Sequence, residues 1–299
     1  MPTLPKLLVV VGPTSSGKSA VAVEAAKLFD GEIVSADSRQ IYKGMDIGTG
    51  KVTEKEMAGI PHHLLDLVEP DGTLTLAEFK KFALEAIDGI ISRGKLPILV
   101  GGTGLYVSAI ADNLEIPEVA PNKKRRARLE KLGDDALFER LREEDPHYAR
   151  RIGPNRRYAI RALEVMEETG KTFTAQQRKG EPIYDIFLVG LTPPENVLED
   201  RIRRRVDTMM SRGLLEETER LSEKYDGDLP ALSGIGYKEL LGYLEEEMTL
   251  REAVEMIKLH TRQYAKRQMT WFKRDKRIVW FTTDKPIYAG IENWLKLAK

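Results

Sequence analysis

The chain has 299 residues, of which 41% are hydrophobic and 31% charged, and its 47 Lys plus Arg balance its 47 Asp plus Glu. This apolar content excludes a disordered protein, and the length indicates about two domains. The absence of Cys excludes disulfides, a thiolate nucleophile and Cys-bound zinc, and it favours a cytoplasmic enzyme over a secreted protein.

The first part of the chain alternates predicted strands with predicted helices. Residues 7–11 form an apolar strand that is too short to span a membrane, and a helix is expected over 19–29. Further strands are expected at 33–36 and 97–100, and a T-x-x-E capping box opens a helix over 76–93 between them. This alternation predicts an α/β protein with a doubly wound parallel sheet.

The strand signal stops near residue 112. Segments rich in Arg and Glu follow, and we interpret 112–185 as an inserted helical domain. Because the sheet pattern returns at 186–191, residues 1–111 and 186–299 are expected to form one core domain. The other expected elements are helices at 122–132, 134–144, 156–169, 195–212, 214–225 and 249–273, and a strand at 277–282.

A glycine-rich loop follows the first strand. Its sequence, GPTSSGKS, matches G-x-x-x-x-G-K-[ST] and lies between a strand and a helix, as a phosphate-binding loop (P-loop) requires. Backbone N–H groups hold phosphate oxygens, Lys18 supplies a cation, and Ser19 offers its hydroxyl to Mg²⁺. A di- or triphosphate site is therefore favoured over an ordinary turn, with Gly12, Pro13, Thr14, Ser15, Ser16, Gly17, Lys18 and Ser19 as the binding residues.

Polar residues also follow the next two strands, at the sheet edge where ligands bind in α/β proteins. Asp37 can hold Mg²⁺ through water, accept a proton from a nucleophile, or cap a turn. The glycines of GGTGLY, residues 101–106, permit close approach of a ligand. For His62 and His63 a structural role is favoured over metal ligation, because adjacent side chains diverge on a strand.

The zero net charge hides three basic clusters, within residues 123–128, 147–161 and 258–277. Clusters with so few acids suit a polyphosphate backbone better than a solvated helix face. In the third cluster, Tyr264 and Trp271 follow an apolar stripe, so core packing is favoured over stacking on bases. Arg205 falls beside the apolar stripe of its helix, and an inward cation needs an anion, which is either a protein carboxylate or a phosphate.

These motifs together resemble the bacterial tRNA dimethylallyltransferases, also called tRNA isopentenyltransferases, of the IPP transferase family. The resemblance runs nearly end to end. It implies a P-loop NTPase-like parallel sheet flanked by helices, with an inserted all-helical domain. The segments that carry it are GPTSSGKS, DSRQIYKGMDIGTGK, PHHLLD, GGTGLY, RALEV, RVDTMMSRGL and TRQYAKRQMTWF.

The resemblance also implies an activity. A dimethylallyl group would pass from its diphosphate to the N6 amine of the adenosine on the 3′ side of a tRNA anticodon, with release of pyrophosphate. The P-loop and Mg²⁺ would hold the diphosphate, and the catalytic residues would be Thr14, Asp37 as the proton acceptor, and Arg205 as the group that neutralises pyrophosphate. The expected tRNA contacts are Asp37, Ser38, Arg39, Gln40 and Thr103 at the target nucleotide, and Arg125, Arg157 and Arg161 of the insertion at the anticodon stem.

Two departures from the family pattern limit this transfer of roles. Asn155 is followed at once by Arg156 and Arg157, where the family usually has an extra polar residue, and the chain lacks the eukaryotic C-terminal zinc finger. Two alternatives are a P-loop small-molecule kinase that uses ATP, and an RNA-binding protein with a structural nucleotide site. The transferase is favoured over both, as a cytoplasmic, monomeric enzyme without membrane association.

Overall fold

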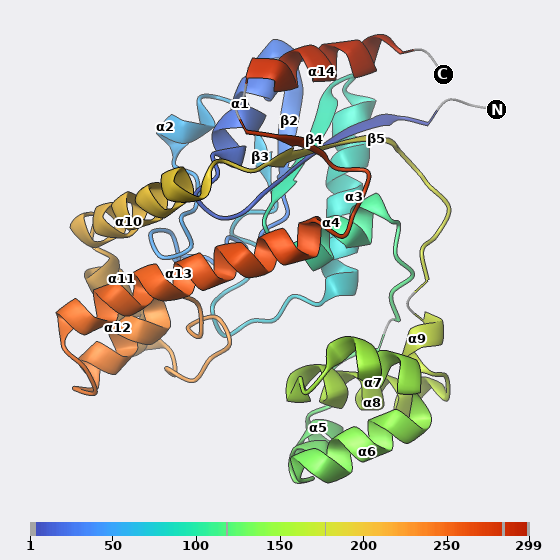
Figure 1. The fold of residues 1–299 in the computed structure, drawn as a ribbon, viewed down its shortest axis with the longest axis vertical. Coiled ribbons are helices and arrows are strands. Elements are labelled where there is room, and N and C mark those ends of the chain that lie inside the picture. The colour runs from blue at the N-terminus through green and yellow to red at the C-terminus, as the bar shows by residue number, and fades with distance from the viewer. Residues whose placement is uncertain (1–3, 118, 177, 283–284, 298–299) are drawn as a thin grey trace. The chain divides into compact units, whose positions relative to one another are not determined.

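The fold is built on a parallel sheet of six strands in the order β3-β2-β4-β1-β5-β6 (Figure 1). The computed structural model describes residues 4–117, 119–176, 178–282 and 285–297. The predicted α/β class and parallel sheet are thereby confirmed. The strands are β1 (Lys6–Val11), β2 (Gly31–Ser35), β3 (His62–His63), β4 (Leu96–Gly101), β5 (Asp185–Leu191) and β6 (Val279–Phe281).

The central strands are buried on both faces, which explains why their sequences are continuous apolar runs instead of alternating patterns. Helices α1 (Lys18–Leu28) and α14 (Lys285–Lys296) contribute to the core on one face. Helices α3 (Leu76–Ser92) and α4 (Gly104–Ala111) contribute to the core on the other. Loops follow β1, β2 and β4 at their carboxyl ends.

The helix boundaries follow local signals in the sequence. Thr75 and Glu78 form the predicted capping box of α3, in which the Thr75 hydroxyl accepts the Glu78 N–H at 3.2 Å and the Glu78 carboxylate accepts the Thr75 N–H at 2.8 Å. Thr249 and Glu252 open α13 (Leu250–Phe272) in the same way. Each cap satisfies N–H groups that the first helical turn leaves unpaired.

A cluster of helices packs beside the carboxyl ends of the strands. It contains α10 (Glu195–Ser211), α11 (Leu214–Lys224), α12 (Tyr237–Leu244) and α13, around a core that includes Ile41 and Met45 from the chain after β2. The elements that were not predicted are β3, α2 (Glu54–Met57), α4, α12, α14, α7 (Pro146–Ile152) and α9 (Phe173–Gln176). Trp271, near the end of α13, is 41% exposed, so the prediction of core packing is wrong for it, whereas the neighbouring Phe272 is buried.

Residues 112–182 form a separate compact unit with its own hydrophobic core. Its helices are α5 (Lys123–Glu130), α6 (Asp134–Glu144), α7 (Pro146–Ile152), α8 (Arg156–Thr169) and α9 (Phe173–Gln176). The expected limit at 185 differs by three residues because Ile183 and Tyr184 pack with the core of the sheet, and Asp185 pairs with Lys6 as β5 begins. Among the described helices of both units, none is long and apolar enough to cross a membrane.

A buried carboxylate at the amino end of β2 makes the stability of the fold sensitive to acid. Glu32 accepts a hydrogen bond from Arg93 at 2.7 Å and lies 2.8 Å from His63 Nε2 and 3.2 Å from Lys95 Nζ. The hydrogen bond from Arg93, aided by His63 and Lys95, lowers the pKa of Glu32 to about 2 although burial opposes the shift.

A carboxyl group whose pKa is lower in the folded state stabilises the protein at pH values above its pKa in the unfolded state. This stabilisation is lost as the pH falls through its pKa in the folded state. The free energy of unfolding should therefore drop between pH 4.5 and 2, with about 3 kcal/mol of that drop due to Glu32. Urea unfolding across this range should show a shallower drop for Glu32→Gln. Glu85→Gln, on the exposed side of α3, should follow the wild type; equal slopes for all three proteins would contradict the prediction.

Candidate active site

The P-loop lies between β1 and α1, as its motif predicts. Gly17 adopts φ +96° at the N-terminus of α1, a conformation that glycine reaches without strain. The Ser16 N–H donates to the Pro13 carbonyl at 3.2 Å, which closes the turn. The N-terminus of α1 thus begins directly after the loop, at the carboxyl end of β1.

Two hydroxyls of this loop are buried without a hydrogen-bond partner. Ser15 Oγ and Ser16 Oγ contact no donor or acceptor within the part of the chain that the structure describes. Buried polar groups are normally satisfied, because leaving one unpaired costs about 1–3 kcal/mol. The hydrogen-bonding capacity of this loop is thus not fully met by the protein residues that the structure describes.

A cavity of about 410 Å³ opens over the P-loop. Thr14, Lys18 and Ser19 line its floor, residues 37–40 line it after β2, and Arg205 enters from α10. Thr103, which follows β4, stands behind residues 37–40, because its Oγ1 accepts the Ser38 N–H at 3.0 Å. Segments that are far apart in the sequence thus bring a phosphate loop, a carboxylate and a second cation to one cavity.

Asp37 holds a turn and still faces the cavity. Its Oδ1 accepts the Arg39 N–H at 2.9 Å, so the turn-capping reading is correct for one oxygen. Oδ2 makes no hydrogen bond to any residue that the structure describes. One carboxylate oxygen thus orients the side chain and the other is available to a ligand.

Arg205 has no carboxylate partner within salt-bridge distance in the described ranges, so the alternative of a protein ion pair is not realised. Burial lowers the pKa of Arg205, while the charges of Asp37 and Glu56 oppose this shift. Its guanidinium lies directly against Gly50, where an added Cβ would come within 1.7 Å of Nη2. A partly buried cation without a protein partner favours binding of an anion.

Lys18 lies close to this second cation. Burial lowers the pKa of Lys18 to about 8, the positive charge of Arg205 adds to the shift, and Asp37 opposes it. The Lys18 ammonium donates to the Pro13 carbonyl at 3.3 Å. Since two desolvated cations repel each other unless an anion joins them, the arrangement suits a diphosphate.

Gln268 is a site residue for which the sequence predicted no functional role. It is buried on α13, where Oε1 accepts the Thr14 N–H at 2.8 Å and Nε2 donates to the Gly102 carbonyl at 2.9 Å. It therefore links the P-loop to the loop after β4. The available signal was an amide at a core position of a helix, where a polar side chain needs fixed partners.

Replacing Gln268 with Glu should weaken binding of inorganic pyrophosphate about tenfold. The carboxylate can accept from Thr14 but cannot donate to Gly102, and its charge lies beside the P-loop. Isothermal titration calorimetry of both proteins measures the change. Gln263→Glu, the same substitution on the exposed side of α13, should bind as the wild type does, and equal affinities for all three proteins would refute the role.

The expected stem-binding arginines lie in the helical unit and are not equally free. Arg125 pairs with Glu168 at 2.6 Å, and Arg161 pairs with Glu164 at 2.6 Å. Arg157 is exposed and has no ion pair with any residue described.

The basic cluster within residues 123–128 is therefore paired with acids in the folded protein, and the prediction of a surface with few acids is wrong for it. Arg126 also pairs with Glu164, and Arg128 with Glu167. The pairing of α5 with α8 brings these acids from about 40 positions away in the sequence.

The two histidines contact neighbouring protein groups, and His62 also lines the cavity. His63 pairs with Glu32, and His62 Nδ1 lies 2.8 Å from the Ile60 carbonyl. Within the described ranges, no group of three or more His, Cys, Asp or Glu side chains is arranged to hold a metal ion.

Comparison with known proteins agrees with this geometry. Residues 40–275 match the IPP transferase family. The chain is 49% identical over 286 residues to a tRNA dimethylallyltransferase of Roseiflexus castenholzii, which covers 94% of each protein. It is 45% identical over 287 residues to that of Anoxybacillus flavithermus, which covers 95% of this chain and 92% of the relative.

Two solved structures are similar over most of the chain. The full-length tRNA isopentenylpyrophosphate transferase of Bacillus halodurans superposes with a TM-score of 0.74 at 39% identity and covers 97% of each chain. A eukaryotic dimethylallyltransferase acting on tRNA gives a TM-score of 0.77 at 33% identity, covering 90% of this chain and 70% of the other. These likenesses confirm the P-loop NTPase-like fold, and the chain belongs to the IPP transferase family.

Proposed function

We propose that this protein transfers a dimethylallyl group from dimethylallyl diphosphate to the N6 amine of the adenosine on the 3′ side of a tRNA anticodon. One observation carries the proposal: a single cavity joins Lys18 of the P-loop, the Arg205 guanidinium and Asp37 Oδ2, and the last two have no partner among the residues that the structure describes. An anion site thus lies beside a proton acceptor. The relatives are named tRNA dimethylallyltransferase, and from this name we take the dimethylallyl group as the group transferred and tRNA as its acceptor.

The residues fit a direct displacement. The amine nitrogen attacks the primary allylic carbon, a C–N bond forms, and the C–O bond breaks with its electron pair leaving on pyrophosphate. Asp37 Oδ2 takes the proton that the amine loses. Lys18 and Arg205 stabilise the negative charge that develops on the leaving group, and Thr14 lies beside them at the P-loop.

Residues 38–40, and the residues that hold them in place, form the part of the cavity where the target nucleotide would bind. The Arg39 guanidinium donates to the carbonyls of Pro230 at 2.7 Å and Ala231 at 3.1 Å, which holds this segment in place. Ser38 and Gln40 would contact the base, with Thr103 holding Ser38 in place, and the base has to leave the stacked anticodon loop to reach Asp37. In the helical unit, Arg157 is the arginine most available to a phosphate of the stem, with Arg125 and Arg161 as further contacts.

The residues present fit a magnesium ion carried by the substrate. Mg²⁺ is usually held by one or two protein groups together with phosphate oxygens and water, so it does not need a dedicated cluster of carboxylates. Ser19 lines the cavity at the start of α1 and would supply a hydroxyl to the ion. The ion would neutralise charge on the diphosphate.

A direct test uses the protein, dimethylallyl diphosphate, Mg²⁺ and unmodified tRNA, followed by digestion and mass spectrometry of the nucleosides. We expect a dimethylallyl-adenosine, and none with a tRNA in which the target adenosine is replaced by guanosine. Absence of the product, together with ATP turnover on a small alcohol, would instead support a kinase. We also propose that the enzyme works as a monomer in the cytoplasm. Analytical ultracentrifugation of the purified protein tests the monomeric state.

A further inference from the structure

One wall of the cavity is a short loop, residues 46–51, which we name the wall loop. Residues 48–50 line the cavity. The wall loop closes on itself, because the Asp46 carbonyl accepts the Lys51 N–H at 2.9 Å and the Ile47 carbonyl accepts the Gly50 N–H at 2.9 Å. Its backbone is therefore ordered as a compact turn.

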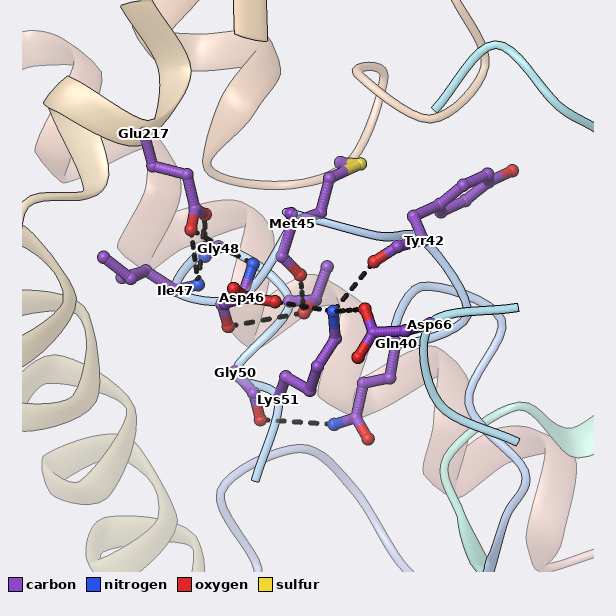
Figure 2. Close-up of polar contacts among 12 residues, drawn as sticks. Gln40, Tyr42, Met45, Asp46, Ile47, Gly48, Gly50, Lys51, Asp66 and Glu217 are labelled. Atoms are coloured by element: carbon purple, nitrogen blue, oxygen red, sulfur yellow. Dashed lines mark hydrogen bonds and ion pairs between the residues drawn. The ribbon is translucent and has the colours of Figure 1, made fainter. Parts of the chain in front are cut away.

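A buried carboxylate from another helix holds this turn. Glu217 of α11 is 6% exposed, and Oε2 accepts the N–H of Asp46 at 3.1 Å and that of Ile47 at 2.9 Å, while Oε1 accepts that of Gly48 at 3.0 Å (Figure 2). In the part of the chain that the structure describes, its hydrogen-bond donors are uncharged and no cation forms a salt bridge with it. A buried charge held only by oriented N–H and O–H groups fixes those groups firmly.

The same carboxylate holds a second wall of the cavity. The Tyr237 hydroxyl donates to Glu217 Oε1 at 2.7 Å, and Tyr237 lines the cavity together with residues 233–236. The two walls touch, since a Cβ on Gly48 would come within 2.4 Å of the Tyr237 ring. Glu217 thereby joins two walls that are nearly 190 residues apart in the sequence.

The far end of the wall loop is held by a buried cation. Lys51 Nζ bonds to the Tyr42 carbonyl at 2.8 Å, to Asp46 Oδ1 at 2.6 Å and to Asp66 Oδ1 at 2.5 Å (Figure 2). Gly50 lies just before Lys51, and its carbonyl accepts a hydrogen bond from Gln40 at 3.2 Å. Gly50 is thus fixed from both sides, and it is the residue on which the Arg205 guanidinium lies.

We propose that Glu217 is a positioning residue for Arg205. By pinning the wall loop it keeps Gly50 beneath the guanidinium, so that Arg205 is already aimed at the leaving group when the diphosphate binds. Neither oxygen of Glu217 needs to touch substrate. The inference rests on the proposed function in that it takes the anion at Arg205 to be a diphosphate.

The test is a binding measurement with inorganic pyrophosphate and Mg²⁺, made by calorimetry on the full chain. Glu217→Gln keeps the shape of the side chain but places an NH₂ group against backbone N–H donors. We expect this variant to bind pyrophosphate at least about tenfold more weakly than the wild type. Unchanged affinity would overturn the proposal.

A matched control separates positioning from general loss of stability. Glu32→Gln removes another buried carboxylate, and neither Glu32 nor its partners Arg93, His63 and Lys95 line the cavity. It should lower the melting temperature yet change pyrophosphate affinity less than about twofold. A loss of affinity equal to that of Glu217→Gln would mean that any destabilised variant binds poorly, and would overturn the proposal.

A double-mutant cycle then tests whether Glu217 acts through Arg205. In an Arg205→Ala background, Glu217→Gln should weaken binding by less than about twofold further, because the group that it positions is gone. The same loss in both backgrounds would overturn the proposal. Should Glu217→Gln not fold, Tyr237→Phe removes a single donor at 2.7 Å, and its cycle with Arg205→Ala decides by the same criterion.

This readout is independent of the reaction. Coupled losses of pyrophosphate binding in a protein that modifies no tRNA would refute the proposed function and leave the positioning role standing. Normal modification of tRNA, together with losses of pyrophosphate binding that are the same with and without Arg205, would support the proposed function and refute the positioning role.

Discussion

Asp37→Asn should lower turnover in the tRNA modification assay by about 10² to 10⁴ while tRNA affinity changes little. The structure makes Asn more informative than Ala at this position. An Asn oxygen can still accept the Arg39 N–H that Asp37 Oδ1 accepts at 2.9 Å, so the turn is kept, but the amide cannot take a proton from the amine. Asp37→Asn therefore removes the role of proton acceptor and keeps the role of holding the turn.

The comparison with Asp37→Ala separates those roles. Loss of turnover of similar size in both variants identifies Asp37 as the proton acceptor. Near-normal turnover in Asp37→Asn with a large loss in Asp37→Ala would show that only the turn matters and would refute the assignment. Single-turnover kinetics at saturating tRNA and dimethylallyl diphosphate, together with filter binding of tRNA, provide both numbers.

Arg205→Ala should reduce turnover by about 10² to 10³ and weaken pyrophosphate binding, because the guanidinium stabilises charge that develops as the C–O bond breaks. In the free protein this cation has no salt bridge among the described residues, so its removal leaves no protein carboxylate unpaired. The folded structure should consequently survive the substitution, with a melting temperature close to that of the wild type.

Arg205→Lys provides a finer comparison. Lys keeps the charge but loses the planar fork that lies on Gly50 and can bind two phosphate oxygens at once. We expect intermediate turnover, and Arg203→Ala, an exposed arginine of the same helix, should behave as the wild type. Full activity in Arg205→Ala would contradict a role in catalysis.

Local signals allowed the sheet and the main helices to be predicted well. The P-loop, two capping boxes and continuous apolar strands are written in short stretches of sequence, and each appears where expected. The strand β3 was missed because two residues carry no periodicity. Helix α12 was missed because its turns are few and it is held by packing against α11 and α13.

The supporting residues of the site were harder to predict for a physical reason. Asp37 and Lys18 belong to motifs whose chemistry is local, but Gln268 and Glu217 act on backbone groups more than 160 positions away. Within their own helices each is only a polar residue at a buried position. The ion pairs of the arginines were also not predictable from local sequence, because the acids that neutralise Arg125 come from another helix.

The bond from Gln268 to Thr14 has a consequence for synthesis of the protein. The P-loop leaves the ribosome among the first twenty residues, yet its floor is secured by a side chain 254 positions later. A nascent chain that ends before α13 contains the complete phosphate motif and lacks Gln268, and one that ends before α10 lacks Arg205 as well. Because chains fold as they emerge, we expect the proposed diphosphate site to be complete only after α13 has been synthesised, so that a shorter chain contains the P-loop motif but binds substrate weakly.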